Sequence, residues 1–177
     1  MKCLLICILL PIWFMGYSQA ETTCAPVRNG KICYSDDVAV ANMSKERLYN
    51  AINKWAVQTY GTDVFFSNVS SNKSRGSILV SSKMELLLND KDKTFIKFRM
   101  RINCLENRYT VEVTDVVYQY DPFNERSYKT YPAENVILNE GKNNSVEIIK
   151  DPRLFCEATH DFAEKLMSEV FDATKKK

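Results

Sequence analysis

Cys156 and His160 are the two residues whose types and spacing come nearest to a catalytic pair. Residues four positions apart on a helix lie on the same face, so a histidine at 160 could activate the thiol of Cys156 as a nucleophile. The sequence shows no loop of oxyanion donors and no third residue placed to orient the histidine. We therefore favour a structural cysteine beside an exposed histidine and keep a small thiol-dependent hydrolase as the alternative.

Metal chemistry has less support in the sequence. Asn89, Asp90 and Asp92 lie close together in the segment NDKDK, but the glycine and the final glutamate of a calcium loop are missing and lysines separate the acids. A zinc site is also disfavoured, because the chain has one histidine and no CxxC pair. We expect a solvated turn at NDKDK, no metal site, no cofactor and no enzymatic activity.

Residues 1–20 have the pattern of a secretory signal peptide. A lysine precedes an uncharged apolar run, and Ser18 and Ala20 occupy the minus-three and minus-one positions of a cut before residue 21. The apolar run contains Pro11 and is shorter than the roughly 20 residues that span a bilayer. We expect export to the periplasm or the cell exterior, with no membrane span after cleavage.

The charge of the chain disfavours nucleic acid as a partner. The sequence has 24 lysines and arginines against 22 aspartates and glutamates, and cleavage of the leader removes one lysine. A nearly neutral exported protein lacks the basic surface that attracts a phosphate backbone. We therefore expect no nucleic-acid partner.

Four cysteines follow the leader: Cys24, Cys33, Cys104 and Cys156. An even number in an exported protein is typical of disulfides, and four cysteines allow three pairings. Cys24 and Cys33 flank a segment with an Asn-Gly turn signal, so we expect these two to pair across a short hairpin. Cys104 and Cys156 are either a second disulfide or two buried thiols.

Two amphipathic helices are expected, at 44–61 and 151–173. Ser44 is suited to cap the first helix, and Asp151 to cap the second ahead of Pro152. Each helix has a stripe of mostly apolar residues along one face. The stripe consists of Leu48, Ile52, Trp55 and Thr59 in the first helix, and of Phe155, Phe162, Leu166 and Val170 in the second. Both helices should bury these stripes against a common core.

The remaining segments favour strands and one long connection. Strand signals occur at 36–42, 63–69, 76–88, 95–104 and 108–120. Residues 121–150 are the least regular part, and a loop of this length in a compact domain is often functional or holds small strands of its own. Within it, 136–149 has the pattern of a short hairpin.

The last two predicted strands fit one antiparallel register with Glu106 and Asn107 as the turn. One face then holds the pairs Cys104–Tyr109, Ile102–Val111 and Met100–Val113, and the other holds Asn103–Thr110, Arg101–Glu112 and Arg99–Thr114. A slip of one residue would exchange the two faces and spoil both patterns. At Asp115 the alternation changes phase, with Tyr118 and Tyr120 among the residues that take over, which predicts a β-bulge or a strong bend.

The order of these elements is similar to that of one half of the TATA-box-binding protein (TBP). In sequence the chain resembles a family of exported bacterial proteins described as a domain of unknown function with a TBP-like fold. The segments that carry the resemblance are SKERLYNAINKWAVQTYG, RGSILV, FIKFRMRI, RYTVEVTDVVYQY and the final helix. The resemblance implies an α+β fold, with a curved antiparallel sheet of about five strands and two helices packed on one face.

The resemblance also bears on domains and location. It implies a Gram-negative exported protein and assigns no activity. We expect a signal peptide at 1–20, a cysteine-containing N-terminal segment at 21–35, one TBP-like domain at 36–173 and a basic tail at 174–177.

The sheet face away from the helices is the remaining candidate site. It should carry Phe65, Ser67, Leu79, Ser81, Lys83, Glu85, Lys97, Arg99, Arg101, Thr110, Glu112 and Thr114. One interpretation is a face left to water, as is common in antiparallel sheets. In the other, Lys97, Arg99 and Arg101 attract an acidic partner to a shallow platform, with Tyr118 and Tyr120 at its edge.

We expect a non-enzymatic binding module that meets a protein, peptide or glycan of the cell envelope through this face and the 121–150 loop. A cystatin-like protease inhibitor is a further alternative, because both architectures place a helix on an antiparallel sheet. It ranks lower because the turns SNKSRG and NDKDK lack an apolar wedge that would enter a protease cleft.

Overall fold

A computed structural model describes residues 24–120, 129–138 and 149–175 of the chain. Its elements are β1 (Val27–Arg28), β2 (Lys31–Ile32), β3 (Tyr34–Ala39), α1 (Lys45–Tyr60), β4 (Ser67–Asn72), β5 (Ser77–Leu87), β6 (Lys93–Leu105), β7 (Arg108–Tyr120), β8 (Lys129–Pro132), α2 (Ala133–Ile137) and α3 (Pro152–Lys175). The predicted leader lies outside the described residues. The expected 36–42 strand corresponds to β3, which begins two residues earlier and ends three residues earlier.

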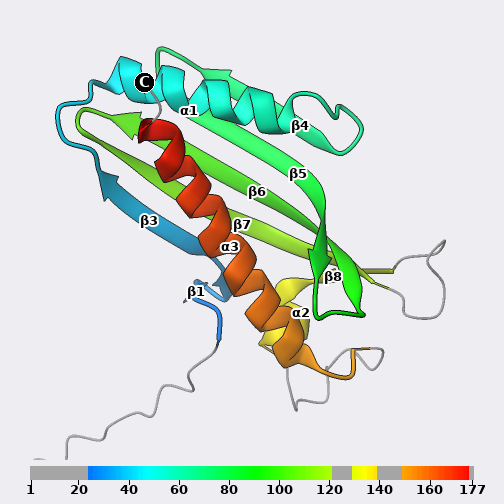
Figure 1. Cartoon of the computed structure of the whole chain (residues 1–177). Helices are drawn as coiled ribbons and strands as arrows, with labels where there is room; N and C mark the ends of the chain where they lie inside the picture. The colour runs from blue at the N-terminus through cyan, green and yellow to red at the C-terminus, as the bar shows by residue number, and fades with distance from the viewer. Residues whose placement is uncertain (1–23, 121–128, 139–148, 176–177) are drawn as a thin grey trace, which may run out of the picture.

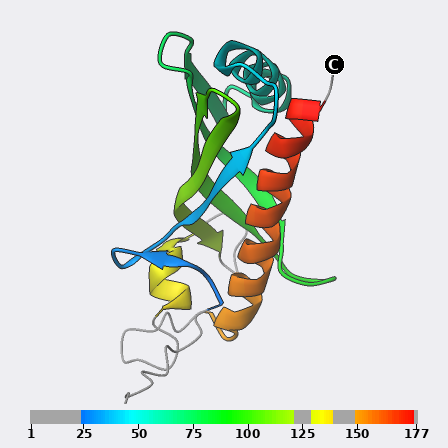
Figure 2. The same ribbon diagram turned by 90° about the vertical axis from the view of Figure 1, so that its left-hand side faces the viewer.

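The sheet is antiparallel, in the order β3-β7-β6-β5-β4, and β8 pairs with the end of β7 beyond β3. Figures 1 and 2 show α1 and α3 on the same side of this open sheet. The predicted α+β architecture is therefore confirmed, with six strands in the sheet instead of about five. Between the helices and the sheet lies one apolar core, in which Leu48, Ile52, Ile96 and Ile102 are fully buried.

Both helices begin where their capping residues predict. The Ser44 hydroxyl accepts a hydrogen bond from the Arg47 amide at 3.4 Å, and the Asp151 carboxylate accepts one from the Arg153 amide at 3.1 Å. Helix α3 runs to Lys175, so the first residues of the expected basic tail continue the helix.

One residue of the predicted α1 stripe was placed wrongly. Thr59 is exposed, and its neighbour Tyr60 is buried in its place. The Tyr60 ring packs edge-on against Phe98 of β6, with centroids 6.4 Å apart. A large aromatic ring at the helix end gains more from burial than threonine does. The last buried residue of α1 is therefore Tyr60, one position after the predicted Thr59.

The β6–β7 hairpin has the register predicted from the sequence, pair for pair from Cys104–Tyr109 to Arg99–Thr114. Its turn residue Asn107 has φ 58°, a left-handed conformation that asparagine tolerates. The predicted bulge is also present, because the register shifts between Lys97 and Arg99 and Asp115 has φ 53°. Beyond the bulge, even-numbered residues of β7 face the helices.

Two expectations about the other strands are corrected. Strand β4 begins at Ser67 and not at 63, because Asp63 closes a turn by accepting the Ser67 amide at 2.9 Å. Ser67 faces the helix side, where its hydroxyl bonds the buried Ser82 hydroxyl at 2.7 Å. Ser67 therefore does not belong to the open face.

The 121–150 connection contains regular structure where it is described. Residues 129–132 form β8 and the next five form α2. The first two residues of the hairpin predicted at 136–149 lie in α2, which contradicts a strand there, and 139–148 lie outside the described residues. Helix α2 contacts the N-terminal hairpin, where Glu134 accepts the amide of the fully buried Ile32 at 3.1 Å.

Candidate functional site

The sheet face opposite α1 and α3 is polar and contains two adjoining depressions. One, of about 530 Å³, lies over β3, β7 and β6, and the other, of about 400 Å³, lies over β4, β5 and β6. Both are lined by Arg101 and Asn103, which stand on β6 between them. Hydroxyl and amide side chains share the lining: Ser35 and Thr110 in the first, and Ser70, Asn72 and Ser77 in the second.

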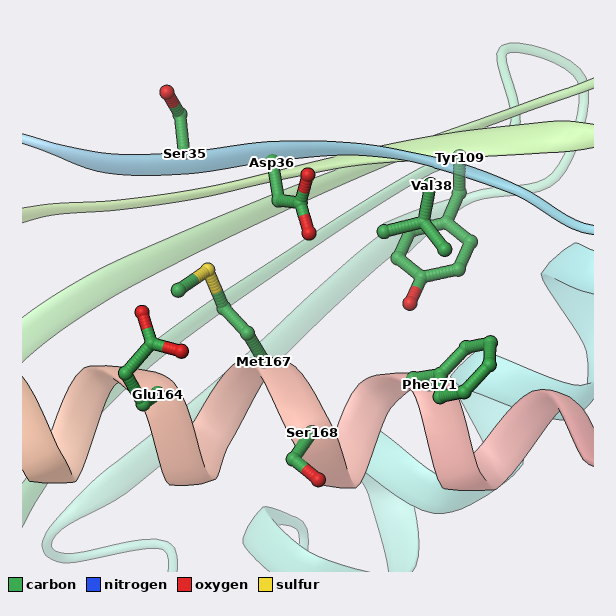
Figure 3. A pocket seen from close by; sticks show the side chains of 8 residues that line it. All are labelled: Ser35, Asp36, Val38, Tyr109, Glu164, Met167, Ser168 and Phe171. Carbon is green, nitrogen blue, oxygen red and sulfur yellow. The ribbon is translucent and has the colours of Figure 1, made fainter.

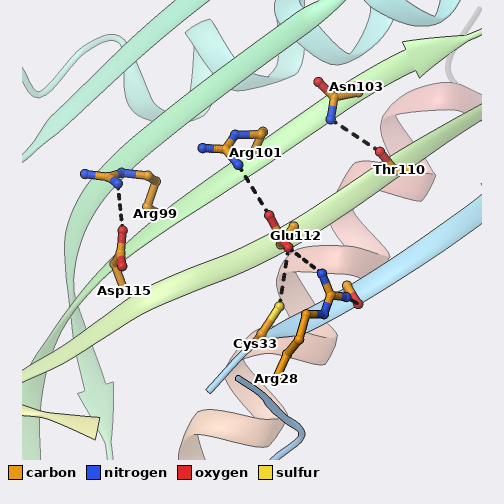
Figure 4. A network of polar contacts seen from close by, with 9 residues as sticks. Arg28, Cys33, Arg99, Arg101, Asn103, Thr110, Glu112 and Asp115 are labelled. Carbon is orange, nitrogen blue, oxygen red and sulfur yellow. Dashed lines mark hydrogen bonds and ion pairs between the residues drawn. The ribbon is translucent and has the colours of Figure 1, made fainter. Parts of the chain in front are cut away.

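Two of the three expected cations of this face, Arg99 and Arg101, are paired with acids of the neighbouring strand (Figure 4). Arg101 lies 3.5 Å from Glu112 and Arg99 lies 2.7 Å from Asp115. Arg28 of the N-terminal hairpin also binds Glu112, at 2.9 Å, so this hairpin lies against one end of the face. Exposed pairs of this kind contribute at most about 1 kcal/mol each, but they leave little net positive charge to attract an acidic partner.

Lys97 lies outside this paired network. It stands opposite Lys83, beside an aromatic cluster formed by Phe66 and Phe95, which the sequence analysis did not assign to this face. Lys83 holds its ammonium 4.3 Å from the Phe95 ring centroid and 5.5 Å from that of Phe66. Burial and the nearby charge of Lys97 lower the pKa of Lys83. Phe65 in the adjoining turn is 90% exposed. Phe95 could have been found in the sequence, because it alternates with Ile96 and so falls on the polar face.

Tyr118 and Tyr120 do not lie at the edge of the open face, contrary to expectation. Tyr118 is fully buried, and its hydroxyl lies 2.6 Å from the Thr159 hydroxyl on α3. Tyr120 is half-buried on the same side, with its ring 5.2 Å from that of Phe155. The bulge at Asp115 accounts for both positions, because the extra residue turns the end of β7 so that these rings meet α3.

The predicted Cys24–Cys33 disulfide is wrong. Cys24 is bonded to Cys156 of α3, with the two Cα atoms 6.0 Å apart, whereas Cys33 and Cys104 are free and buried. The Asn-Gly turn between Cys24 and Cys33 does form, but the Cys33 thiol points to Glu112, 3.5 Å away. The turn therefore pairs Val27 with Ile32, but it does not join the two cysteines that flank it.

The pairing of Cys156 also removes the basis of the hydrolase alternative. A sulfur atom held in a disulfide has no thiolate to act as a nucleophile. His160 is exposed, and its ring lies 5.9 Å from that of Tyr34. Within the described ranges, no group of three or more His, Cys, Asp and Glu side chains is arranged to hold a metal ion. None of the described helices has the length and apolar character of a membrane span.

We expect Cys33 and Cys104 of the folded protein to resist alkylation by iodoacetamide at pH 8. Burial raises the pKa of both thiols, that of Cys104 to about 11, so both stay protonated. The unfolded chain loses the Cys104 proton near pH 8.5 while the folded chain keeps it, so the contribution of Cys104 to stability declines as pH rises from there through about 11, and that of Cys33 changes in the same direction. Mass spectrometry after alkylation, with and without urea, tests this; modification of native Cys104 at pH 8 would contradict it.

Comparison with known proteins gives two kinds of match. A family model described as "Domain of unknown function (DUF4468) with TBP-like fold" matches residues 34–119. The crystal structure of a TBP-like protein from Parabacteroides distasonis ATCC 8503 is similar over 86% of this chain and 98% of that one, with 61% identity and a TM-score of 0.82. A DUF4468 family protein from Bacteroides ovatus ATCC 8483 is similar over 88% of this chain and 93% of that one. Its TM-score is 0.73 at 18% identity, which shows the fold alone. A comparison with curated proteins found no match.

Proposed function

Since the chain belongs to the family of domains of unknown function with a TBP-like fold, we propose that it is an exported, non-enzymatic module that binds a polypeptide segment on its open sheet face. The observation that carries the proposal is the pair of adjoining depressions that share Arg101 and Asn103. Depressions on two sides of one strand give an extended segment a continuous path across the sheet.

The polarity of the face fits a polypeptide better than a strongly acidic partner. Arg101 offers donors and Glu112 offers acceptors in the same depression, and Asn103 offers both. A peptide backbone likewise has alternating donors and acceptors, so it can match such a surface group by group. An anion would have to displace the carboxylates already bound to Arg99 and Arg101.

The aromatic cluster supplies the apolar contact that a stable interface needs. Phe66 is 52% exposed beside Lys83, and Phe95 lies under the same ammonium group. Partners usually gain most of their binding free energy from a few such apolar or aromatic anchors, with a polar surround. We therefore place an apolar side chain of the bound segment at Phe66 and its polar part at Arg101.

The disulfide supports export, because such bonds persist in oxidising compartments. The predicted leader agrees with this proposal. Periplasm and cell exterior are equally compatible with both features.

We expect a photo-crosslinker placed at Ser81, on the open face, to capture a polypeptide from the native envelope fraction. The change Arg101→Glu should lower this capture about tenfold, because it removes the cationic donor that both depressions share. The fold should persist, since the replaced ion pair is exposed. Quantitative mass spectrometry of the crosslinked products gives the measurement.

Lys54, exposed on α1 and therefore on the other side of the sheet, is the matched control position. The same products from Ser81 and Lys54, or no effect of Arg101→Glu, would mean that the open face is only hydrated. A product that survives protease treatment of the envelope fraction would indicate a glycan in place of a polypeptide.

A further inference from the structure

A second concave site lies on the helix side of the protein, between edge strand β3 and the C-terminal half of α3 (Figure 3). It is a groove of about 410 Å³ lined by Ser35, Asp36, Val38, Tyr109, Glu164, Met167, Ser168 and Phe171. Volumes of this size accommodate small ligands or a single side chain of a partner. The groove lies on the helix side of β3 and the first depression on its open side, and Ser35 and Asp36 of this edge strand line both.

The floor of the groove contains a polar atom without a partner. Tyr109 is fully buried, and its hydroxyl has no hydrogen-bond partner among the described residues. Figure 3 shows this hydroxyl pointing from β7 toward α3, between Met167 and Phe171. Buried hydroxyl groups are normally satisfied, because an unpaired one loses its hydration without compensation. A ligand atom in the groove would supply the missing partner.

The rim of the groove is acidic on both sides. Asp36 of β3 and Glu164 of α3 are exposed and turn their carboxylates toward the space between the two elements (Figure 3). Burial raises the pKa of Tyr109 to about 12, and the charges of Asp36 and Asp172 add to this effect. No lysine or arginine of the described residues lines the groove, and Lys175, one turn beyond Phe171, is bound to Asp172 at 2.9 Å. The groove therefore has a negative potential.

The walls favour a ligand with a hydrocarbon part. Val38 and Met167 are half-buried and apolar, and Phe171 is 37% exposed. The Phe171 ring already holds an ammonium group, since Nζ of Lys175 lies 4.0 Å from its centroid. The Phe171 ring is therefore able to make a cation–π contact as well as an apolar one.

We propose that the groove binds a primary alkylammonium group, with its nitrogen among Asp36, Glu164 and the Tyr109 hydroxyl and its carbon chain along Met167 and Phe171. An ammonium group has three N–H donors, and these three side chains offer three acceptors. The chemistry is common to a free linear amine and to a lysine side chain of a partner. The experiment separates these two sources.

Isothermal titration of the full disulfide-bonded chain with pentylamine tests the proposal. We expect saturable binding in the millimolar range or tighter, and none with 1-pentanol or pentanoate, which have the same chain without the positive charge. Asp36→Asn and Glu164→Gln should each weaken binding about fivefold, as expected for a solvent-accessible charge pair. Tyr109→Phe, which removes one hydroxyl from the floor, should weaken it by a similar factor.

Glu157→Gln is the matched control, because Glu157 is exposed on the same helix but does not line the groove. Equal weakening by Glu157→Gln, equal binding of 1-pentanol, an unchanged affinity in Tyr109→Phe, or no binding up to about 10 mM would overturn the proposal. A peptide with one internal lysine that binds at least fivefold more tightly than pentylamine identifies a partner's side chain as the ligand, and the reverse order identifies a free amine. Arg101→Glu should leave amine binding unchanged, so the groove and the open face are tested separately.

Discussion

Replacing Cys24 by serine should lower the free energy of unfolding by about 4 kcal/mol. The disulfide joins residues 132 positions apart, so in the unfolded chain it holds closed a long loop whose closure costs several kcal/mol of entropy. Cys24 is exposed, so the substitution leaves no cavity in the core, and the loss reports on the crosslink itself. Urea unfolding followed by circular dichroism gives the difference.

Chemical reduction provides the control for this prediction. The reduced wild type and the Cys24→Ser variant should unfold at the same urea concentration, because both lack the same crosslink. Non-reducing proteolysis should release one peptide that joins Cys24 to Cys156. A peptide that joins Cys24 to Cys33 would refute the pairing, and an unchanged midpoint in Cys24→Ser would refute its role in stability.

Gly76→Ala should destabilise the protein by about 3 kcal/mol. Gly76 has φ 73°, a conformation that costs alanine about 1 kcal/mol or more. A Cβ atom there would also lie 2.8 Å from the carbonyl oxygen of Cys104, which is backbone of the central β6 strand and cannot move alone. The same urea titration measures the effect.

Gly30→Ala is a matched control for the steric part of this effect. Gly30 has nearly the same φ, 74°, but a Cβ atom there meets nothing within 4 Å. We expect a loss of about 1 kcal/mol, from the backbone conformation alone. If the two variants lose equal stability, then the close approach of β6 to Gly76 has no energetic consequence.

The parts of the fold that were predictable are those set by neighbours in sequence. The β6–β7 register follows from the two-residue period, because a slip of one residue would expose Ile102 and Val111 and bury Arg101. The helix starts follow from Ser44 and Asp151, since each cap bonds an amide two or three residues ahead.

The candidate site was predictable in part. Arg99, Arg101 and Glu112 lie on the open face as the strand period indicates. The pair of Arg101 with Glu112 was predicted. The second partner of Glu112, Arg28, was not predicted, because it lies in a hairpin 84 positions away in sequence. Tyr118 was misplaced even though the bulge was predicted, because the direction in which a bulge turns a strand depends on the packing against α3.

The sequence alone determined the α+β class, the helix caps, the central hairpin and the polar character of one sheet face. All of these rest on periods and turns that span at most a few residues, so the local chain chemistry decides them. Only the tertiary structure decided that Cys24 bonds Cys156, that Arg101 is common to two depressions and that the Tyr109 hydroxyl lies unpaired beneath β3. Each of these depends on how segments distant in sequence meet, and that is set by the packing of the whole core.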